Sequence, residues 1–102
     1  MSVVVVATIT PLPGEMDAVR AAILAAVPAV HAEPGCELYA AHEGDGEFVM
    51  IERWADVDAL RVHGKAEALT TLGGQLAGKV AGPPEVKRLA AVPAGDAAKG
   101  AV

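Results

Sequence analysis

Apolar and polar residues follow two different periods along this chain, and each period predicts a kind of element. Residues 2–9, SVVVVATI, form a β-branched run that stops at a turn rich in Pro and Gly, which is typical of a strand. Between residues 15 and 32 the apolar positions recur every three or four residues, which predicts a helix. Pro28 lies inside this helix and should bend or end it, because the carbonyl of Leu24 loses its hydrogen bond.

A β-hairpin is predicted next. The short runs 36–43 and 47–54 flank Gly44-Asp45-Gly46, a combination typical of two strands joined by a tight turn. Alternate residues of the second run share a face, and one face carries Phe48, Met50, Glu52 and Trp54. The opposite face is also partly apolar, so we expect both faces of the sheet to be covered, one by helices and one by a second subunit.

The last third of the chain predicts two helical stretches and a strand. Asp56 is a good N-cap for a helix that runs through Leu60 and His63. A second helical stretch covers residues 65–78, where Gly73-Gly74 predicts a break or a frayed turn, since each Gly costs about 1 kcal/mol relative to Ala. Residues 85–92 complete the pattern as a strand.

The order of elements is β-α-β-β-α-β, which indicates an α+β, ferredoxin-like domain over residues 3–92. The low-complexity segment 93–102 is expected to be a flexible tail. Twenty-two of the 102 residues are Ala and 14 are Val, so each core side chain buries little area. A domain this small with such a core should be more stable as a homodimer than as a monomer.

Charge and cysteine content narrow the class of protein. Eight Lys and Arg against 13 Asp and Glu argue against nucleic acid and against anionic membranes as partners. The single Cys36 excludes an internal disulfide and a Cys-based zinc cage. No apolar run approaches the roughly 18 residues that span a bilayer, and the N-terminal segment lacks the basic start of a signal peptide. We therefore expect a soluble, cytoplasmic protein.

Several segments together resemble the antibiotic biosynthesis monooxygenase family, over about residues 3–92. The most specific part is the Glu-x-Trp end of a strand with a His nine residues later. The segments that carry the resemblance are Pro13-Gly14-Glu15, Glu33-Pro34-Gly35-Cys36, Tyr39, the strand from Phe48 to Trp54, Asp56, Ala59-Leu60 and His63.

The resemblance implies a dimeric α+β barrel, in which two four-stranded sheets pack face to face, with a pocket between sheet and helices in each subunit. Several members of the family are cofactor-independent oxygenases that convert phenols or hydroquinones to quinones with O2 and without metal, flavin or haem. Others degrade haem with a set of Asn, Trp and His. This sequence contains no Asn, so haem degradation is not expected.

Oxygenation without a cofactor needs a base that deprotonates the substrate in a dry pocket. His63 follows Leu60 by three residues, so it should point inward and is the first candidate for that base; the alternative is a structural His bonded to a backbone carbonyl. Glu52 is the second candidate, since a carboxylate beside Trp54 in a dry pocket has a raised pKa. The alternative for Glu52 is an ion pair or a bond to backbone amides.

Two aromatic residues are candidates for substrate binding. Trp54 could stack on a planar ligand or could anchor the core. Tyr39 could donate its hydroxyl to a quinone oxygen or could simply pack in the core or in an interface. The alternation of the strand places His42 on the face of Cys36 but roughly 20 Å away, too far for a Cys–His pair.

The sequence therefore predicts a homodimer that oxidises an aromatic phenol or quinol with O2 and needs no cofactor. The three His residues lack the spacing of a metal site, and no phosphate-binding loop is present. The alternative hypothesis is a dimer that binds a ligand or scavenges oxidants without catalysis. The two hypotheses differ in turnover, because only the enzyme loses a rate when His63 is replaced.

Overall fold

The computed structural model describes residues 1–102. Four strands and three helices alternate along the chain. In order they are β1 (Val3–Ile9), α1 (Met16–His31), β2 (Cys36–Gly44), β3 (Glu47–Trp54), α2 (Val57–Gly64), α3 (Glu67–Leu76) and β4 (Glu85–Leu89). This order confirms the predicted α+β, ferredoxin-like class, with the second helical region divided into α2 and α3.

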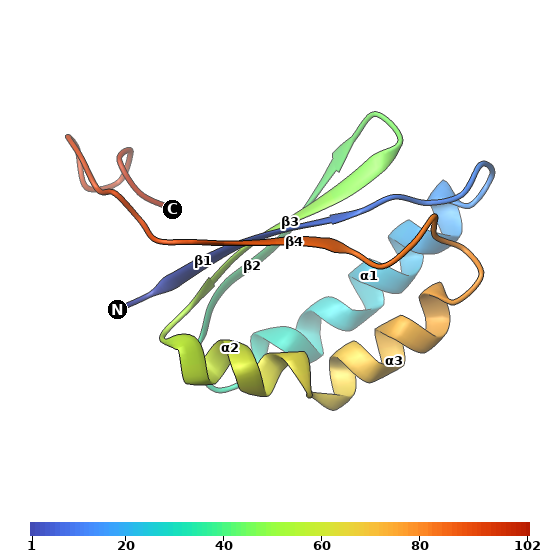
Figure 1. Cartoon of the computed structure of the whole chain (residues 1–102), viewed down its shortest axis with the longest axis horizontal. Coiled ribbons are helices and arrows are strands. Elements are labelled where there is room, and N and C mark those ends of the chain that lie inside the picture. The colour runs from blue at the N-terminus through green and yellow to red at the C-terminus, as the bar shows by residue number, and fades with distance from the viewer.

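The strands form one antiparallel sheet in the order β2-β3-β1-β4. All three helices lie against one face of this sheet, and no element covers the other face (Figure 1). β1 and β3 are the central strands, because each has a strand on both sides. The side chains of β3 that face the helices are therefore enclosed by neighbouring strands and by helices.

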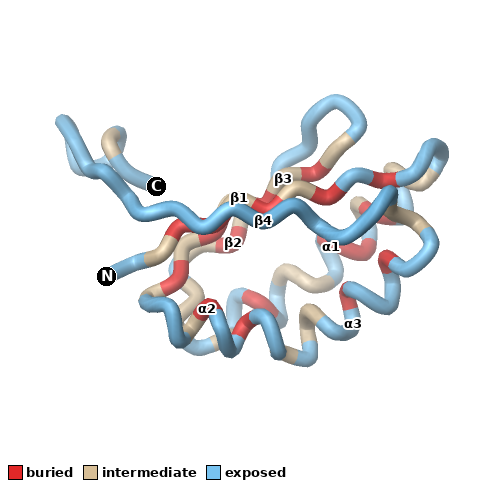
Figure 2. The backbone as a smooth tube through the Cα atoms, in the orientation of Figure 1, coloured by how far each residue is buried: buried red, intermediate tan, exposed pale blue.

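The core lies between the sheet and the helices. Buried positions follow the central strands and the inward sides of α1 and α3, whereas β4 is exposed along its whole length (Figure 2). The residues that exclude solvent most completely are Trp54, Ile23, Met50, Val5, Val19 and Val30. Most of these are aliphatic, so Trp54 contributes more buried area than any other single side chain in this group.

α1 continues past Pro28 to His31, so of the two predicted effects of this proline, a bend or an end of the helix, the end does not occur. The carbonyl of Leu24 loses its usual partner, but Leu24 is exposed, so water can bond to it. Beyond the proline, fully buried Val30 holds the last turn against the core. Burial of that turn offsets the local cost of the missing hydrogen bond.

α3 runs without interruption through Gly73-Gly74, so the predicted break at this position is also wrong. Leu72 and Leu76 are buried on either side of the glycines and join the core. This tertiary packing outweighs a propensity cost of about 1 kcal/mol for each Gly. The last strand is shorter than predicted, since it ends at Leu89 rather than at residue 92.

None of the helices combines the length and the apolar character needed to cross a membrane. Residues 93–102 form no helix or strand and are almost entirely exposed.

Candidate functional site

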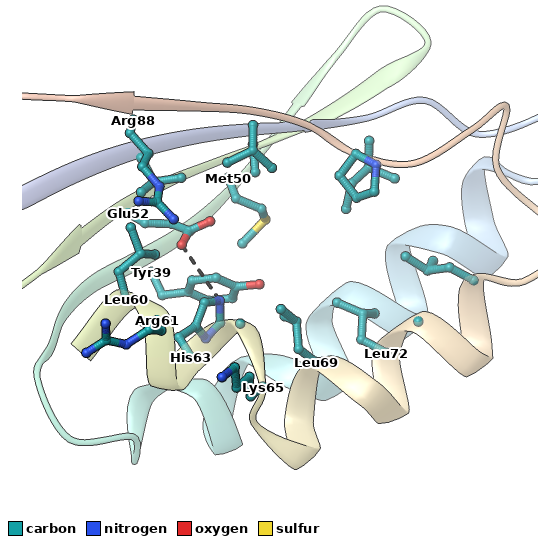
Figure 3. Close-up of a pocket in the computed structure, with 18 residues that line it drawn as sticks. Tyr39, Met50, Glu52, Leu60, Arg61, His63, Lys65, Leu69, Leu72 and Arg88 are labelled. Carbon is teal, nitrogen blue, oxygen red and sulfur yellow. Dashed lines mark ion pairs between the residues drawn. The ribbon is translucent and has the colours of Figure 1, made fainter. Parts of the chain in front are cut away.

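A cavity of about 560 Å³ opens between the helix-facing side of the sheet and helices α2 and α3 (Figure 3). Most of its wall is apolar and includes Val5, Met50, Leu60, Leu69, Leu72 and Val86. Polar groups gather at one end, where Tyr39, Glu52 and His63 lie close together. A volume of this size suits a small organic ligand, and the few convergent polar groups would orient it.

His63 lies at this polar end because helix α2 positions it there. The carboxylate of Asp56 accepts a hydrogen bond of 2.7 Å from the backbone N–H of Ala59, which confirms the predicted N-cap. Leu60 and His63 are the two buried residues of the helix, and their spacing of three residues puts them on one face. The side chain of His63 therefore points inward, as the sequence predicts.

β3 contributes Glu52 and Trp54, which alternate onto the same face of the sheet. The indole Nε1–H of Trp54 donates a hydrogen bond of 2.9 Å to Oε1 of Glu52. Only 4% of Glu52 is exposed, and burial raises the pKa of its carboxyl group above the ordinary value, partly offset by the bond from Trp54. A carboxyl group with a raised pKa can hold a proton at a pH where an exposed Glu would have lost it.

The imidazole of His63 stacks on the indole of Trp54, with ring centroids 4.3 Å apart. Trp54 is completely buried and does not border the cavity. The ring that covers the indole is thus the imidazole, so Trp54 fixes the plane of His63 from behind. Nε2 of His63 lies 3.9 Å from Oε1 of Glu52, within electrostatic range but beyond a good hydrogen bond.

Tyr39 reaches the cavity because β2 contains a bulge. The pairing with β3 shifts between Cys36 and Leu38, so Cys36 pairs with Trp54 and Tyr39 pairs with Glu52. Without this extra residue Tyr39 would face away from the helices. The ring of Tyr39 lies 5.7 Å from that of His63, and burial raises the pKa of its hydroxyl group, which stays a hydrogen-bond donor.

The bulge also corrects the predicted relation between Cys36 and His42. Counted in strict alternation the two residues share a face, whereas in the structure Cys36 is opposite Trp54 and His42 is opposite Val49, on the other side of the sheet. His42 is exposed. His31, at the end of α1, lies with Nε2 3.0 Å from the carbonyl oxygen of Tyr39 and so supports β2.

Glu33 is a member of the site that the sequence pattern did not predict. Its Oε1 lies 2.9 Å from Nδ1 of His63, and the side chain is 11% exposed. A carboxylate can only accept at this position, so Nδ1 carries the proton and Nε2 is the nitrogen left for the cavity. The one signal in the sequence is the acid of Glu-Pro-Gly, which by itself indicates only the end of a helix.

Gly35 explains how this turn approaches α2. Its φ of +80° is a conformation that side chains rarely adopt, and a Cβ at this position would lie 2.5 Å from Cβ of Ala59. The backbone N–H of Ala55 also donates to the carbonyl of Gly35 at 2.8 Å. The absence of a side chain therefore lets the turn pack against α2 and bring Glu33 to His63.

The second oxygen of Glu33, Oε2, is buried without a hydrogen-bond partner. Such an atom costs about 1–3 kcal/mol, so stability alone does not explain an acid at this position. No three His, Cys, Asp or Glu side chains are arranged to hold a metal ion. Of the four polar groups at this end, Glu33 lies 2.9 Å from His63, His63 lies 3.9 Å from Glu52, and the ring of Tyr39 packs against that of His63.

Comparison with known proteins adds the family. The model of the antibiotic biosynthesis monooxygenase family matches residues 2–72. The chain belongs to this family. The match includes every polar group of the cavity end described above, and it supports the resemblance drawn from the sequence. No curated protein matches the chain.

Solved structures agree with the family assignment. Rv0793 from Mycobacterium tuberculosis is 28% identical, with a TM-score of 0.84 over 94% of this chain and 100% of that one. PA3566 from Pseudomonas aeruginosa is 28% identical, with a TM-score of 0.82 over 89% of this chain and 94% of that one. A structure described as an antibiotic biosynthesis monooxygenase is 29% identical, with a TM-score of 0.81 over 89% of this chain and 99% of that one.

Proposed function

We propose that this family member is a cofactor-independent monooxygenase that oxidises an aromatic phenol or quinol with O2. For a phenol with a free ring position, the balanced reaction consumes one O2. The substrate loses its hydroxyl proton and one ring C–H bond. One oxygen atom forms the new carbonyl of a quinone, and the other leaves with the two hydrogens as water.

The observation that carries the proposal is the group of buried polar residues, Tyr39, Glu52 and His63, at one end of a largely apolar cavity. His63 presents Nε2 to this end, and Glu33 accepts from Nδ1 on the far side of the ring. A substrate hydroxyl in the cavity can pass its proton to Nε2, and the carboxylate of Glu33 then stabilises the imidazolium. The phenolate left behind is electron-rich enough to transfer an electron to O2, and the apolar wall keeps water away from the resulting pair.

Glu52 and Tyr39 are assigned supporting steps in this proposal. Tyr39 donates its hydroxyl to the oxygen of the substrate as negative charge develops there. Glu52 receives or returns a proton during formation of water in this proposal, and its raised pKa supports that role. Trp54 holds the imidazole plane and bonds to Glu52, and it needs no contact with substrate in this arrangement.

The test is O2 consumption by purified, metal-stripped protein with a panel of naphthohydroquinones and anthrones. We expect His63→Ala to lower kcat by about 10²- to 10⁴-fold, since it removes the base. Tyr39→Phe, which removes only a hydroxyl group, should lower kcat less. His42→Ala is the matched control, because His42 is exposed on the opposite face of the sheet and should keep full activity.

The panel also separates the enzyme from a protein that only binds. Ligand binding without O2 consumption, for every compound and with a folded protein, would exclude the oxygenase and favour the binding alternative. Full activity in His63→Ala would exclude the assigned base. Haemin added to the same protein should give no product, in keeping with the lack of any Asn.

We further propose that the protein functions as a homodimer in the cytoplasm. The sheet face away from the helices carries half-buried aliphatic residues, including Val6, Val49 and Ile51, and no element of the chain covers it. A second copy placed there would bury this surface. Analytical ultracentrifugation should give twice the chain mass, and Ile51→Lys should shift it toward the monomer. A monomeric wild-type protein at micromolar concentration would contradict this proposal.

A further inference from the structure

Positive charge gathers at the cavity although the chain carries a net charge of −5. Three of the eight Lys and Arg residues line the cavity: Arg61, Lys65 and Arg88. Arg61 is paired with Asp58. Lys65 and Arg88 have no acidic partner within ion-pair distance. Two unpaired positive charges therefore lie at the rim of the largely apolar cavity.

Arg88 is placed there by the register of the sheet. Tyr39 pairs with Glu52, Glu52 with Val5, and Val5 with Arg88, so these four residues form one row across all four strands. The row faces the helices, and all four of its members line the cavity. The side chain of Arg88 extends from β4 toward the chamber, above Glu52 (Figure 3).

Lys65 lies on the wall of the cavity opposite Arg88. It follows the last residue of α2, two positions after His63, and lies below the chamber in the same view (Figure 3). The two unpaired cations therefore approach the cavity from the sheet and from the helices. The acidic groups lie farther from the solvent than these two cations. Glu52 bonds to the buried Trp54, and Glu33 bonds to the buried His63.

The spacing within this row also limits the length of a ligand that contacts both of its ends. Glu52 and Arg88 are separated by the strand that carries Val5, so their backbones are about two strand spacings, roughly 10 Å, apart. A ligand with its hydroxyl group at His63 and Glu52 and an anionic group at Arg88 spans at most a distance of this order, because the side chain of Arg88 extends from β4 toward the cavity (Figure 3). Two fused aromatic rings with a substituent have such a length.

We infer that the cavity selects an aromatic substrate that bears a carboxylate, which Arg88 and Lys65 bind at the rim while the phenol end lies at His63. The inference rests on the proposed function, because it names the substrate class of the same cavity. A guanidinium group matches the two oxygens of a carboxylate, whereas the ammonium of Lys65 adds a point charge. The apolar wall between the two ends accommodates the rings.

The experiment measures binding and does not need turnover. The probes are a naphthalene carboxylate and the corresponding carboxamide, which have almost the same shape and differ in charge. Isothermal titration calorimetry on the full chain should show at least about tenfold tighter binding of the carboxylate. Arg88→Gln should remove most of this preference, and Lys65→Gln should reduce it further.

Lys87→Gln is the matched control. Lys87 precedes Arg88 on β4, is also exposed and unpaired, and is on the other face of the sheet. The control should therefore bind both probes as the wild type does. Circular dichroism checks that each variant is folded, which we expect because all three residues are exposed or at the rim.

Equal affinity for the two probes, or no binding of the carboxylate at millimolar concentration, would overturn the inference. A preference that survives in the Arg88→Gln, Lys65→Gln double variant would overturn it as well. The outcome is separable from that of the oxygenase. Charge-selective binding without O2 consumption would exclude the oxygenase alone, and turnover of neutral quinols without charge selectivity would exclude only the anionic substrate.

Discussion

The two faces of β3 give charged residues opposite environments, one exposed and one buried, although Glu52 and Arg53 are neighbours in the chain. Arg53 points away from the helices, where its Nε lies 3.1 Å from Oε1 of Glu37 and water reaches about a third of each side chain. Glu52 points toward the helices, has no Lys or Arg within ion-pair distance, lies 3.9 Å from Nε2 of His63, and bonds to an indole. One face thus carries a surface ion pair, and the other carries a buried acid beside the cavity.

The difference shows what the helices contribute. Burial under α2 and α3 removes the solvent that would keep Glu52 ionised, so its pKa rises, whereas the exposed face leaves charges in water. The same alternation of a single strand therefore gives one face a buried carboxyl group with a raised pKa and the other face a partly exposed ion pair. Substitutions on the two faces test this contrast, and their expected effects on stability and activity decrease from the first to the last.

Trp54→Ala should have the largest effect, because it empties a fully buried position of the helix-facing side. We expect the free energy of unfolding to fall by about 3–5 kcal/mol, as for other buried aromatic residues. Urea unfolding measures it, with the milder Trp54→Phe as a second variant. A loss below about 1 kcal/mol for Trp54→Ala would show that the indole does not anchor this face.

Glu33→Gln tests whether an acid is required behind His63. The amide can still accept from Nδ1 but cannot stabilise the imidazolium by charge, so kcat should fall about tenfold to a hundredfold with little change in KM. Glu37→Gln is the matched control, since Glu37 pairs only with groups away from the cavity. Equal losses in the two variants would assign Glu33 a merely structural role.

The raised pKa of Glu52 predicts a specific pH dependence of the free energy of unfolding. Burial raises its pKa above the ordinary value of 4.5, so the folded protein binds this proton more tightly than the unfolded chain does. The stability that this provides is complete below pH 4.5 and is lost as the pH rises through the folded-state pKa. A tenfold difference in proton affinity between the folded and unfolded states corresponds to about 1.4 kcal/mol.

Glu52→Gln should remove this loss while the amide oxygen still accepts from Trp54. Urea titrations at a series of pH values above 4.5 should therefore show a flatter stability curve for the variant than for the wild type. A steeper decline in the variant, or identical curves, would contradict the raised pKa of this group.

Arg53→Gln should have the smallest effect, because it breaks only an exposed ion pair on the opposite face. We expect a change of about 0.2–1 kcal/mol in the free energy of unfolding, decreasing at high salt. Catalytic rates should not change unless the substitution disturbs the proposed dimer. Thermal unfolding in low and in high salt measures this contribution, and a loss that salt does not reduce would contradict a simple surface ion pair.

Local sequence was sufficient for the elements that depend on near neighbours. The hairpin around Gly44-Asp45-Gly46, the cap at Asp56 and the shared face of Glu52 and Trp54 all follow from interactions within a few residues, and the structure confirms them. The inward direction of His63 belongs to the same group, because it follows from the helical period that also buries Leu60.

Contacts between distant segments decided the rest. Glu33 and His63 are 30 residues apart, and they meet only because Gly35 lets a turn pack against α2. The bulge after Cys36 turns Tyr39 into the cavity, and the register of β4 brings Arg88 to its rim.

The pattern of residue types thus dictates which face each residue of a regular element takes, since that depends only on the period of the element. Packing dictates which faces meet, because the contact energies responsible come from residues far apart in the chain. α3 illustrates the second point: two glycines oppose the helix locally, and burial of Leu72 and Leu76 in the core beside α1 keeps it intact.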